Sequence, residues 1–292
     1  MALGSAIPAP GARLEERLFL VGCSRSGTTL LQVLLSNHPD IHSFPETSFF
    51  INAIGVCRRP LAKLGLATGK ERQAMLRFLK RVGREELSAL VPRRPLLLRT
   101  AVLSFVAILD RLALEEGKQV WVEKSPMHIH YVGFIRKFVP NARFIHMLRD
   151  GREVVASLYD RALRYPERFG RQSTADFAIR RWNRAVEISR RWTGKPGHVV
   201  VFYEELVREP DRVLRRVCGE LEIPYDAKMA TKGAVQTGVV MPHQKWMLGA
   251  LNPPQRVEPK FQRLFGEEER ERITRALNSH LLEEIRTEVG AL

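Results

Sequence analysis

Residues 18–31 read LFLVGCSRSGTTLL, and this stretch decides the fold. The apolar run 18–21 predicts a buried strand, which leads through a loop bounded by Gly22 and Gly27 into the apolar start of a helix. A loop of this kind points backbone N–H groups and a helix N-terminus at one spot, where a phosphate-like anion is stabilised. The stretch therefore predicts an anion-binding loop at the edge of an α/β sheet.

The loop differs from a nucleoside-triphosphate loop at a decisive position. Gly22 and Gly27 have the G-x-x-x-x-G spacing of that motif, but Thr28 and Thr29 follow where it needs Lys and then Ser or Thr. The lysine that contacts the β- and γ-phosphates is thus missing, and a cation stands inside the loop, at Arg25. We infer a cradle for an anion other than a magnesium-bound triphosphate.

Composition narrows the class of protein. With 292 residues and 45% apolar content, we expect a single domain over residues 15–292 after a flexible tail over residues 1–14. The net charge of +15 indicates an anionic ligand, acceptor or surface. We do not expect a nucleic-acid partner, because the basic residues are scattered and form no zinc-finger or RNP-type motif.

Cysteines and apolar runs bear on the location of the protein. Cys23, Cys57 and Cys218 are widely spaced and odd in number, which favours a reducing compartment, and Cys23 is interpreted as a small packed thiol. The N-terminal residues lack the pattern of a secretion signal, and no apolar run approaches the ~18 residues of a membrane span. We therefore expect a cytoplasmic protein without a membrane span, whose positive charge leaves peripheral membrane contact open.

The rest of the chain predicts alternating strands and helices with one long interruption. The predicted strands are 119–122, 143–148 and 198–202. Residues 50–117 are rich in Leu, Ala, Arg and Lys, which predicts a helical insertion between two strands. Residues 230–263 have little periodicity and are interpreted as a surface loop or a lid over the ligand, and residues 267–288 predict one charged helix.

Charged side chains follow the predicted strands at the sheet edge where ligands gather in parallel sheets. Lys124 follows one strand and Arg149 the next, and Ser157 lies two turns along the helix that begins after Arg149. Asp150 and Glu153 have the spacing of a helix capping box. We expect Lys124, Arg149 and Ser157 to contact an anionic ligand.

Glu46 lies in a short extended or turn segment soon after the anion loop, because the residue before Pro45 is pushed out of the α region. A carboxylate in this place is a candidate general base. The alternative is that Glu46 only caps a helix over residues 47–54, and the residues alone leave both interpretations open.

Several of these motifs together resemble the sulfotransferases that use 3′-phosphoadenosine 5′-phosphosulfate. They are residues 25–29, 124–126, 149–152 with Ser157, 181–183 and 203–206. The resemblance is closest to the branch with tyrosylprotein sulfotransferases and many bacterial sulfotransferases, and runs from about Leu18 to Leu221. It implies a P-loop NTPase-like sulfotransferase fold, in which a parallel sheet lies between two helical layers.

The resemblance also implies roles for individual residues. Residues 25–29 would hold the 5′-phosphosulfate, Arg149 and Ser157 the 3′-phosphate, and Lys124 the bridging or transferring group. Glu46 would be the general base, and Arg25 and Lys124 would act with it on the reacting group. The cofactor-binding residues implied are Cys23, Ser24, Arg25, Ser26, Gly27, Thr28, Thr29, Arg149, Ser157 and Tyr203. A sulfuryl group carries less charge than a terminal phosphate, so we expect no metal ion.

Other residues remain alternatives. The cytosolic sulfotransferases of small molecules have a Lys-Thr-His pattern in which the histidine is the base. This chain reads Lys124, Ser125 and Pro126 at the corresponding site, so no histidine falls there. The nearby His128 and His130 stay candidate bases. The candidates for a basic residue that closes over the cofactor are Lys232, Lys245 and Arg256.

The acceptor and the function class also stay open. Ser48 stands where the branch has an arginine, and Phe49 and Phe50 after it predict a more apolar entrance. The expected acceptor is a hydroxyl on a carbohydrate, a lipid or another small molecule, and the pattern carries no signal for an oligomeric state. The rival functions are a nucleotide-binding protein without turnover and a P-loop nucleotide kinase with an atypical loop.

Overall fold

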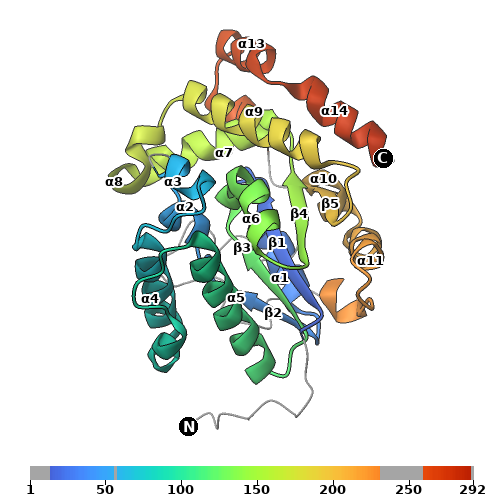
Figure 1. Cartoon of the computed structure of the whole chain (residues 1–292). Coiled ribbons are helices and arrows are strands. Elements are labelled where there is room, and N and C mark those ends of the chain that lie inside the picture. Colours follow the sequence, from blue (N-terminus) through green and yellow to red (C-terminus); the bar gives the residue numbers. More distant parts are fainter. Residues whose placement is uncertain (1–13, 56–57, 231–258, 291–292) are drawn as a thin grey trace.

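The computed structural model describes residues 14–55, 58–230 and 259–290. A five-stranded sheet, parallel throughout, has the order β2-β3-β1-β4-β5 and lies at the centre of the fold (Figure 1). The strands are β1 (Glu16–Gly22), β2 (Ile41–Phe44), β3 (Val120–Lys124), β4 (Ala142–Leu148) and β5 (His198–Phe202). Because β1 pairs with both β3 and β4, the loop after Gly22 leaves the middle of the sheet.

Side chains of β1 alternate between two apolar cores. Leu18 and Leu20 belong to one core, and Phe19 and Val21 belong to the other, as the two-residue period of a strand requires. A central parallel strand is covered on both faces, which explains the continuous apolar run in the sequence. The predicted arrangement of a parallel sheet between helical layers is confirmed.

Helices cover the two faces unequally. One core is completed by α1 (Thr28–Ser36) and α11 (Pro210–Glu220). The larger core contains side chains of α5 (Leu98–Glu115), α6 (Val132–Phe138), α7 (Gly151–Arg164) and α9 (Ala175–Trp192). The remaining α-helices and 3₁₀ segments are α2 (Phe49–Ala53), α3 (Arg59–Lys63), α4 (Lys70–Val82), η1 (Glu85–Leu90), η2 (Pro126–Tyr131), α8 (Pro166–Phe169), η3 (Gly170–Gln172), α10 (Tyr203–Arg208), η4 (Ala227–Ala230), α12 (Lys260–Leu264), α13 (Glu267–Ala276) and α14 (Ser279–Glu288). The stretch between β2 and β3 thus carries α2, α3, α4, η1 and α5, at the place of the expected helical insertion.

The C-terminal segment is two helices, so the prediction of one helix over residues 267–288 is wrong. The break lies between α13 and α14, where Asn183 of α9 donates to the Ala276 carbonyl at 2.9 Å and accepts from the Asn278 N–H at 3.0 Å. A side chain from another helix therefore satisfies backbone groups that a continuous helix would have used. Figure 1 shows α13 and α14 as separate rods near α9.

The N-terminus of α7 is capped differently from the predicted capping box. Asp150 accepts from the Arg152 N–H at 2.8 Å, as expected of an N-cap. Glu153 does not reach back to Asp150, whose N–H donates to Glu204 at 3.0 Å. Glu153 instead accepts from the N–H of Lys260 at 3.3 Å, which fixes α12 against α7.

Three expectations concern residues that the structure does not describe. The predicted tail falls almost entirely on residues 1–13, and residues 231–258 of the predicted lid lie outside the described residues. So do Lys232, Lys245 and Arg256. Among the described residues, no helix is long and apolar enough to cross a membrane.

Candidate active site

The two glycines of the predicted cradle stand where no other residue fits. Gly22 has a φ of 156°, and a Cβ there would lie 2.5 Å from the carbonyl oxygen of Met147 on β4. Gly27 has a φ of 94°, and a Cβ there would lie 2.4 Å from the ring of Tyr203. The loop is thus pressed against β4 and the start of α10, so its backbone approaches any bound anion without intervening side chains.

The cradle opens onto the N-terminus of α1. Gly27 is the N-cap of this nine-residue helix, and no side chain caps it. Uncapped N–H groups at a helix N-terminus carry a partial positive charge and bind anions. Arg25 adds a full charge from a left-handed backbone conformation, with a φ of 76°, which is rare for a residue with a side chain.

The structure brings together residues that the resemblance assigned to the 5′-phosphosulfate and to the 3′-phosphate. The guanidinium Nε of Arg25 donates to the hydroxyl of Ser157 on α7 at 3.0 Å. Arg149 donates to the carbonyl oxygen of Arg25 at 3.3 Å, and its guanidinium lies 4.2 Å from the centre of the Tyr203 ring. Arg25, Arg149, Ser157 and Tyr203 therefore form one cluster around the loop.

The electrostatics of this cluster favour an anion. Burial lowers the pKa of Arg25, and the neighbouring charge of Arg149 lowers it further. The Nε of Arg149 is buried and has no hydrogen-bond partner among the described residues. Such groups are normally satisfied, so the orphaned donor fits a phosphate or sulfate oxygen.

Two further arginines stand beside the loop. Arg181 of α9, part of the 181–183 motif, donates to the hydroxyl of Ser24 at 3.1 Å. Burial lowers the pKa of Arg161 on α7 to about 10, and the charges of Arg25 and Arg181 add to the effect. Sequence reasoning missed Arg161, although it lies four residues after Ser157 and so on the same face of the helix.

Glu46 and Lys124 meet at the end of β3. The Lys124 ammonium lies 2.5 Å from a carboxylate oxygen of Glu46 and 3.3 Å from the hydroxyl of Thr29 on α1. The lysine side chain is 1% exposed, whereas that of Glu46 is 22% exposed. The carboxylate therefore has access to a ligand, and it pairs with Lys124 instead of capping the next helix, which begins after Ser48.

A second, fully buried carboxylate holds the Glu46 segment in place. Glu123, the neighbour of Lys124 on β3, accepts from the N–H of Thr47 at 3.1 Å and from its hydroxyl at 2.8 Å. It also accepts from the hydroxyl of Ser125 at 2.5 Å and from Nδ1 of His128 at 2.9 Å. Burial alone would raise the pKa of Glu123, but these donors hold it below its usual range.

The same group of residues binds the backbone that follows Thr47. Ser125 accepts from the N–H of Ser48 at 2.9 Å, and Nε2 of His128 accepts from the N–H of Phe50 at 3.2 Å. Glu123, Thr47, Ser125 and His128 are called the Glu123 hub below. Because the hub fixes successive N–H groups directly after Glu46, it determines where the Glu46 carboxylate stands.

Neither candidate histidine is in a state that suits a general base. His128 is fully buried, and both its ring nitrogens are bonded, with Nε2 as acceptor and Nδ1 as donor. It has no lone pair for a substrate proton. Burial and the charges of Arg181, Arg59 and Arg184 lower the pKa of His130 to about 4, which makes it a weak base.

The predicted apolar entrance is not formed by Phe49 and Phe50. Both rings are buried, and Phe49 stacks on Phe105 of α5 with centroids 3.9 Å apart. These phenylalanines anchor the segment after Glu46 in the core. Cys23 is a packed thiol as expected, 3% exposed, and burial raises its pKa to about 11.

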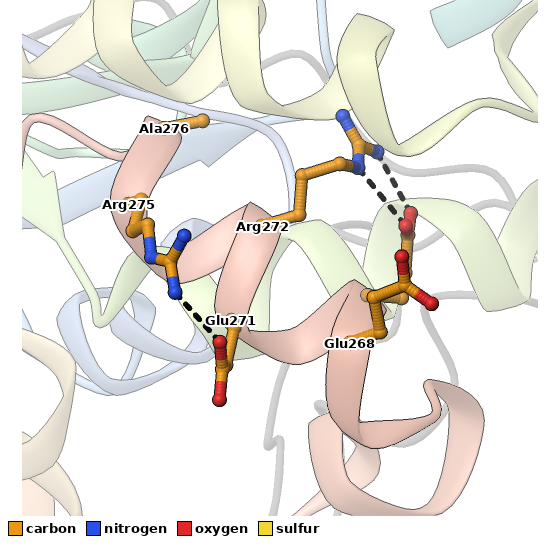
Figure 2. A pocket seen from close by; sticks show the side chains of 6 residues that line it. Glu268, Glu271, Arg272, Arg275 and Ala276 are labelled. Atoms are coloured by element: carbon orange, nitrogen blue, oxygen red, sulfur yellow. Dashed lines mark hydrogen bonds and ion pairs between the residues drawn. The ribbon is translucent and has the colours of Figure 1, made fainter.

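Two other features lie apart from the cradle. Among the described residues, no group of three or more His, Cys, Asp or Glu side chains could hold a metal ion. A hollow on α13 is lined by Glu268, Glu269, Glu271, Arg272, Arg275 and Ala276 (Figure 2). Arg272 pairs with Glu269 and Arg275 pairs with Glu271. Both arginines of this hollow already have carboxylate partners, since Arg272 also pairs with Asp176 of α9, so we assign it no role.

The fold and the cradle define a class of protein: an α/β protein whose first strand ends in a glycine-bounded loop at a helix N-terminus, a form that suits anions. The chain matches the model of the sulfotransferase family over residues 17–227, and it belongs to this family. The span agrees with the predicted limits, from about Leu18 to Leu221.

Individual relatives are about a quarter identical to this chain over the aligned residues. The protein-tyrosine sulfotransferase of Drosophila melanogaster is 26% identical over 212 residues, which cover 72% of this chain and 38% of that protein. Protein-tyrosine sulfotransferase 1 of Homo sapiens is 27% identical over 214 residues, which cover 72% of this chain and 52% of that protein. The chain thus spans about half or less of the length of these relatives.

Solved structures share the fold over most of the chain. The sulfotransferase domain from the curacin biosynthetic pathway has a TM-score of 0.58 and 18% identity, and the match covers 96% of this chain and 99% of that domain. Mouse sulfotransferase SULT7A1 complexed with PAP has a TM-score of 0.53 and 12% identity, with 95% of this chain and 89% of that one covered. The predicted sulfotransferase fold is thereby confirmed.

Proposed function

We propose that this protein transfers a sulfuryl group from 3′-phosphoadenosine 5′-phosphosulfate to a hydroxyl acceptor, with Glu46 as the general base. The observation that carries the proposal is the Lys124–Glu46 pair beside an arginine-lined loop, 2.5 Å between ammonium and carboxylate. The positive charge of Lys124 suits the anionic sulfate donor, and the negative charge of Glu46 suits the proton of the acceptor hydroxyl. A protein that only bound the nucleotide would need no partly exposed carboxylate there.

The donor supplies the activated sulfuryl group, and the chain binds and orients it. The backbone of residues 23–29, with Arg25, binds the 5′-phosphosulfate, and Arg149 and Ser157 bind the 3′-phosphate. The ring of Tyr203 packs against the guanidinium of Arg149, whose carbon lies 4.2 Å from the ring centre. We add Arg161 and Arg181 to the cations that balance the charge of the donor.

The proposed reaction is an in-line displacement. The acceptor oxygen bonds to sulfur, the bond from sulfur to the bridging phosphate oxygen breaks, and adenosine 3′,5′-bisphosphate departs with that oxygen. Glu46 takes the acceptor proton, and Lys124 stabilises the negative charge that grows on the bridging oxygen. Arginines and backbone N–H groups suffice for this charge, so the proposal includes no metal ion.

The proposal also covers the class of acceptor and the cellular location of the protein. The acceptor hydroxyl belongs to a carbohydrate, a lipid or another small molecule. A cytoplasmic location rests on the cysteines, and both Cys23 and Cys218 are buried free thiols.

Calorimetry and one substitution test the proposal together. We expect the protein to bind adenosine 3′,5′-bisphosphate and to prefer it over ATP with Mg²⁺. Glu46→Gln should retain bisphosphate affinity, because the cradle is untouched, while turnover of the sulfate donor with a panel of alcohol, phenol and sugar acceptors falls about 10²- to 10⁴-fold. The matched control is Glu268→Gln, an exposed glutamate of α13, which should change neither quantity.

The outcomes separate the rival functions. A preference for ATP with Mg²⁺ would support the nucleotide kinase. Bisphosphate binding without turnover on any acceptor would support a binding protein. Near-normal turnover of Glu46→Gln would move the base to another residue, with His130 next to be replaced.

A further inference from the structure

Exposed leucines gather at one tip of the insertion. Leu64 after α3 is 73% exposed and Leu96 before α5 is 80% exposed, although both lie beside ordered backbone. The leucine tip comprises Leu61, Leu64, Leu66, Leu96 and Leu97, each at least 40% exposed. Single exposed leucines are common on protein surfaces, but a group of five at one place indicates an interaction site.

Backbone hydrogen bonds hold the two segments of the leucine tip together. Leu66 and Leu97 form an antiparallel bridge. The Ala67 N–H donates to the Leu96 carbonyl at 2.9 Å, and the Leu98 N–H donates to the Gly65 carbonyl at 2.7 Å. Two chain segments, bridged by residues 31 positions apart in sequence, therefore present their leucines from one fixed platform.

The charge around the leucine tip has a single sign. Residues 58–67 and 92–99 contain basic residues and no Asp or Glu. The basic residues are Arg58, Arg59, Lys63, Arg93, Arg94 and Arg99. Of these, Lys63, Arg93, Arg94 and Arg99 are exposed and form no ion pair within the described parts of the chain. The next carboxylate along the chain, Glu71, is buried and accepts from the Thr68 N–H.

The tip lies at the same end of the molecule as the cradle. Helix α5 leads directly into β3, and a crossover helix runs antiparallel to the strand that it precedes. The start of α5, with Leu97 before it, is therefore near the carboxyl ends of the strands. Arg59 of α3 confirms this, because it donates to the His130 carbonyl at 3.4 Å, in the η2 segment that follows Lys124.

We propose that the leucine tip docks on an anionic lipid bilayer. Leucines that enter the acyl boundary and cations that lie at the headgroups are the combination that binds such a surface. A second copy of this chain would bring cations against cations. The undescribed segments of this chain are also unsuitable, since residues 1–13 and 231–258 carry more basic than acidic residues. The proposal concerns lipid binding alone and does not depend on the proposed catalytic function.

Sedimentation with vesicles tests the proposal on the full-length chain. We expect binding to vesicles of phosphatidylcholine and phosphatidylglycerol in equal parts, little binding to phosphatidylcholine alone, and weaker binding as salt rises. Arg93→Gln with Arg94→Gln should lower the partition coefficient roughly fivefold per arginine. Leu64→Glu with Leu96→Glu should abolish binding at every salt concentration, because a carboxylate opposes both insertion and the surface charge.

A matched control is Leu163→Glu, since Leu163 on α7 is 53% exposed and lies outside the leucine tip. It should bind vesicles like the unchanged protein, apart from the loss expected for one added negative charge. Equal binding by the tip variant and the control would overturn the proposal, as would no binding to the anionic vesicles. So would a dimer in analytical ultracentrifugation that Leu64→Glu dissociates, because the occupant would then be a second copy. Circular dichroism of each variant checks that a loss of vesicle binding is not a loss of folding.

Discussion

At the residue scale, the shape of the cradle depends on Gly27 and on the Tyr203 ring that packs against it. The Tyr203 ring contacts both Gly27 and the Arg149 guanidinium, so a side chain at Gly27 would displace the ring and disturb the guanidinium that stacks on it. The left-handed φ of 94° adds backbone strain for any other residue. The absence of a side chain at Gly27 therefore allows the Tyr203 ring to hold its place against Arg149.

Gly27→Ala is therefore predicted to disrupt ligand binding. We expect at least tenfold weaker binding of adenosine 3′,5′-bisphosphate by calorimetry, and a free energy of unfolding lower by about 1–3 kcal/mol in urea titrations. The control is Gly133→Ala on α6, where an added Cβ meets no atom within 4 Å. That variant should keep its affinity and gain up to about 1 kcal/mol of stability. Unchanged affinity of Gly27→Ala would contradict the proposed position of the 5′-phosphosulfate.

At the scale of elements, β3 carries two charged residues with different tasks. Lys124 reaches the site, whereas Glu123 points to the opposite face and holds the segment between β2 and α2. Neighbouring residues of a strand face opposite ways, so one strand end both supplies a charge and fixes its partner. The Glu123 hub is a positioning device, because no member of it needs to touch the substrate.

Glu123→Gln is predicted to lower turnover through the position of Glu46. The amide nitrogen of Gln cannot accept the hydrogen bonds that one carboxylate oxygen now accepts, so the segment shifts. We expect kcat to fall about 10- to 100-fold, with bisphosphate affinity within threefold of the unchanged protein. The control Glu71→Gln removes another buried carboxylate, 1% exposed, that accepts from Thr68 in the insertion. It should lower stability alone. Equal kcat values for the two variants would rule out a positioning role.

At the scale of the whole molecule, buried histidines make stability depend on pH. His146 of β4 bonds to His198 of β5 at 3.0 Å and to Ser189 of α9 at 3.1 Å. Burial lowers the pKa of His146 to about 3, with a smaller effect of His198, and burial lowers the pKa of His198 to about 4. Both rings are therefore neutral in the folded protein well below their usual pKa of about 6.5.

Stability should fall as the pH drops from about 6.5 towards 4. In this window the unfolded chain binds protons on these histidines and the folded protein does not, so acid favours the unfolded state. For His146 alone the loss at pH 5 is about 2 kcal/mol relative to pH 8. Urea titrations across this range measure the slope, and His146→Gln should flatten it. A slope that is unchanged in that variant would show that other groups cause the acid sensitivity.

Local sequence patterns were sufficient for the frame of the molecule. The apolar run before Gly22, the glycine spacing and the three later strands predicted four of the five strands and the loop after β1, because strand burial and loop geometry depend on neighbouring residues. The edge strand β2 was predicted only in part, as a short extended or turn segment. The placement of Lys124 and Arg149 also followed, since parallel strands end at one edge. Longer patterns failed at the C-terminus, where Asn183 from α9 interrupts a helix that its own residues permit.

Only the tertiary structure decided what the site residues do to one another. Glu46 and Lys124 are 78 positions apart, and they meet because the strand order places β2 beside β3. The same order turns Glu123 into the hub of the Glu46 segment and buries Phe49 and Phe50, which the sequence had placed at an entrance. Sequence patterns record which face of an element is apolar, whereas contacts between distant elements depend on how crossovers arrange the strands. That is why the loop after β1 was predictable from the sequence, whereas the pairing of Glu46 with Lys124 was visible only in the assembled sheet.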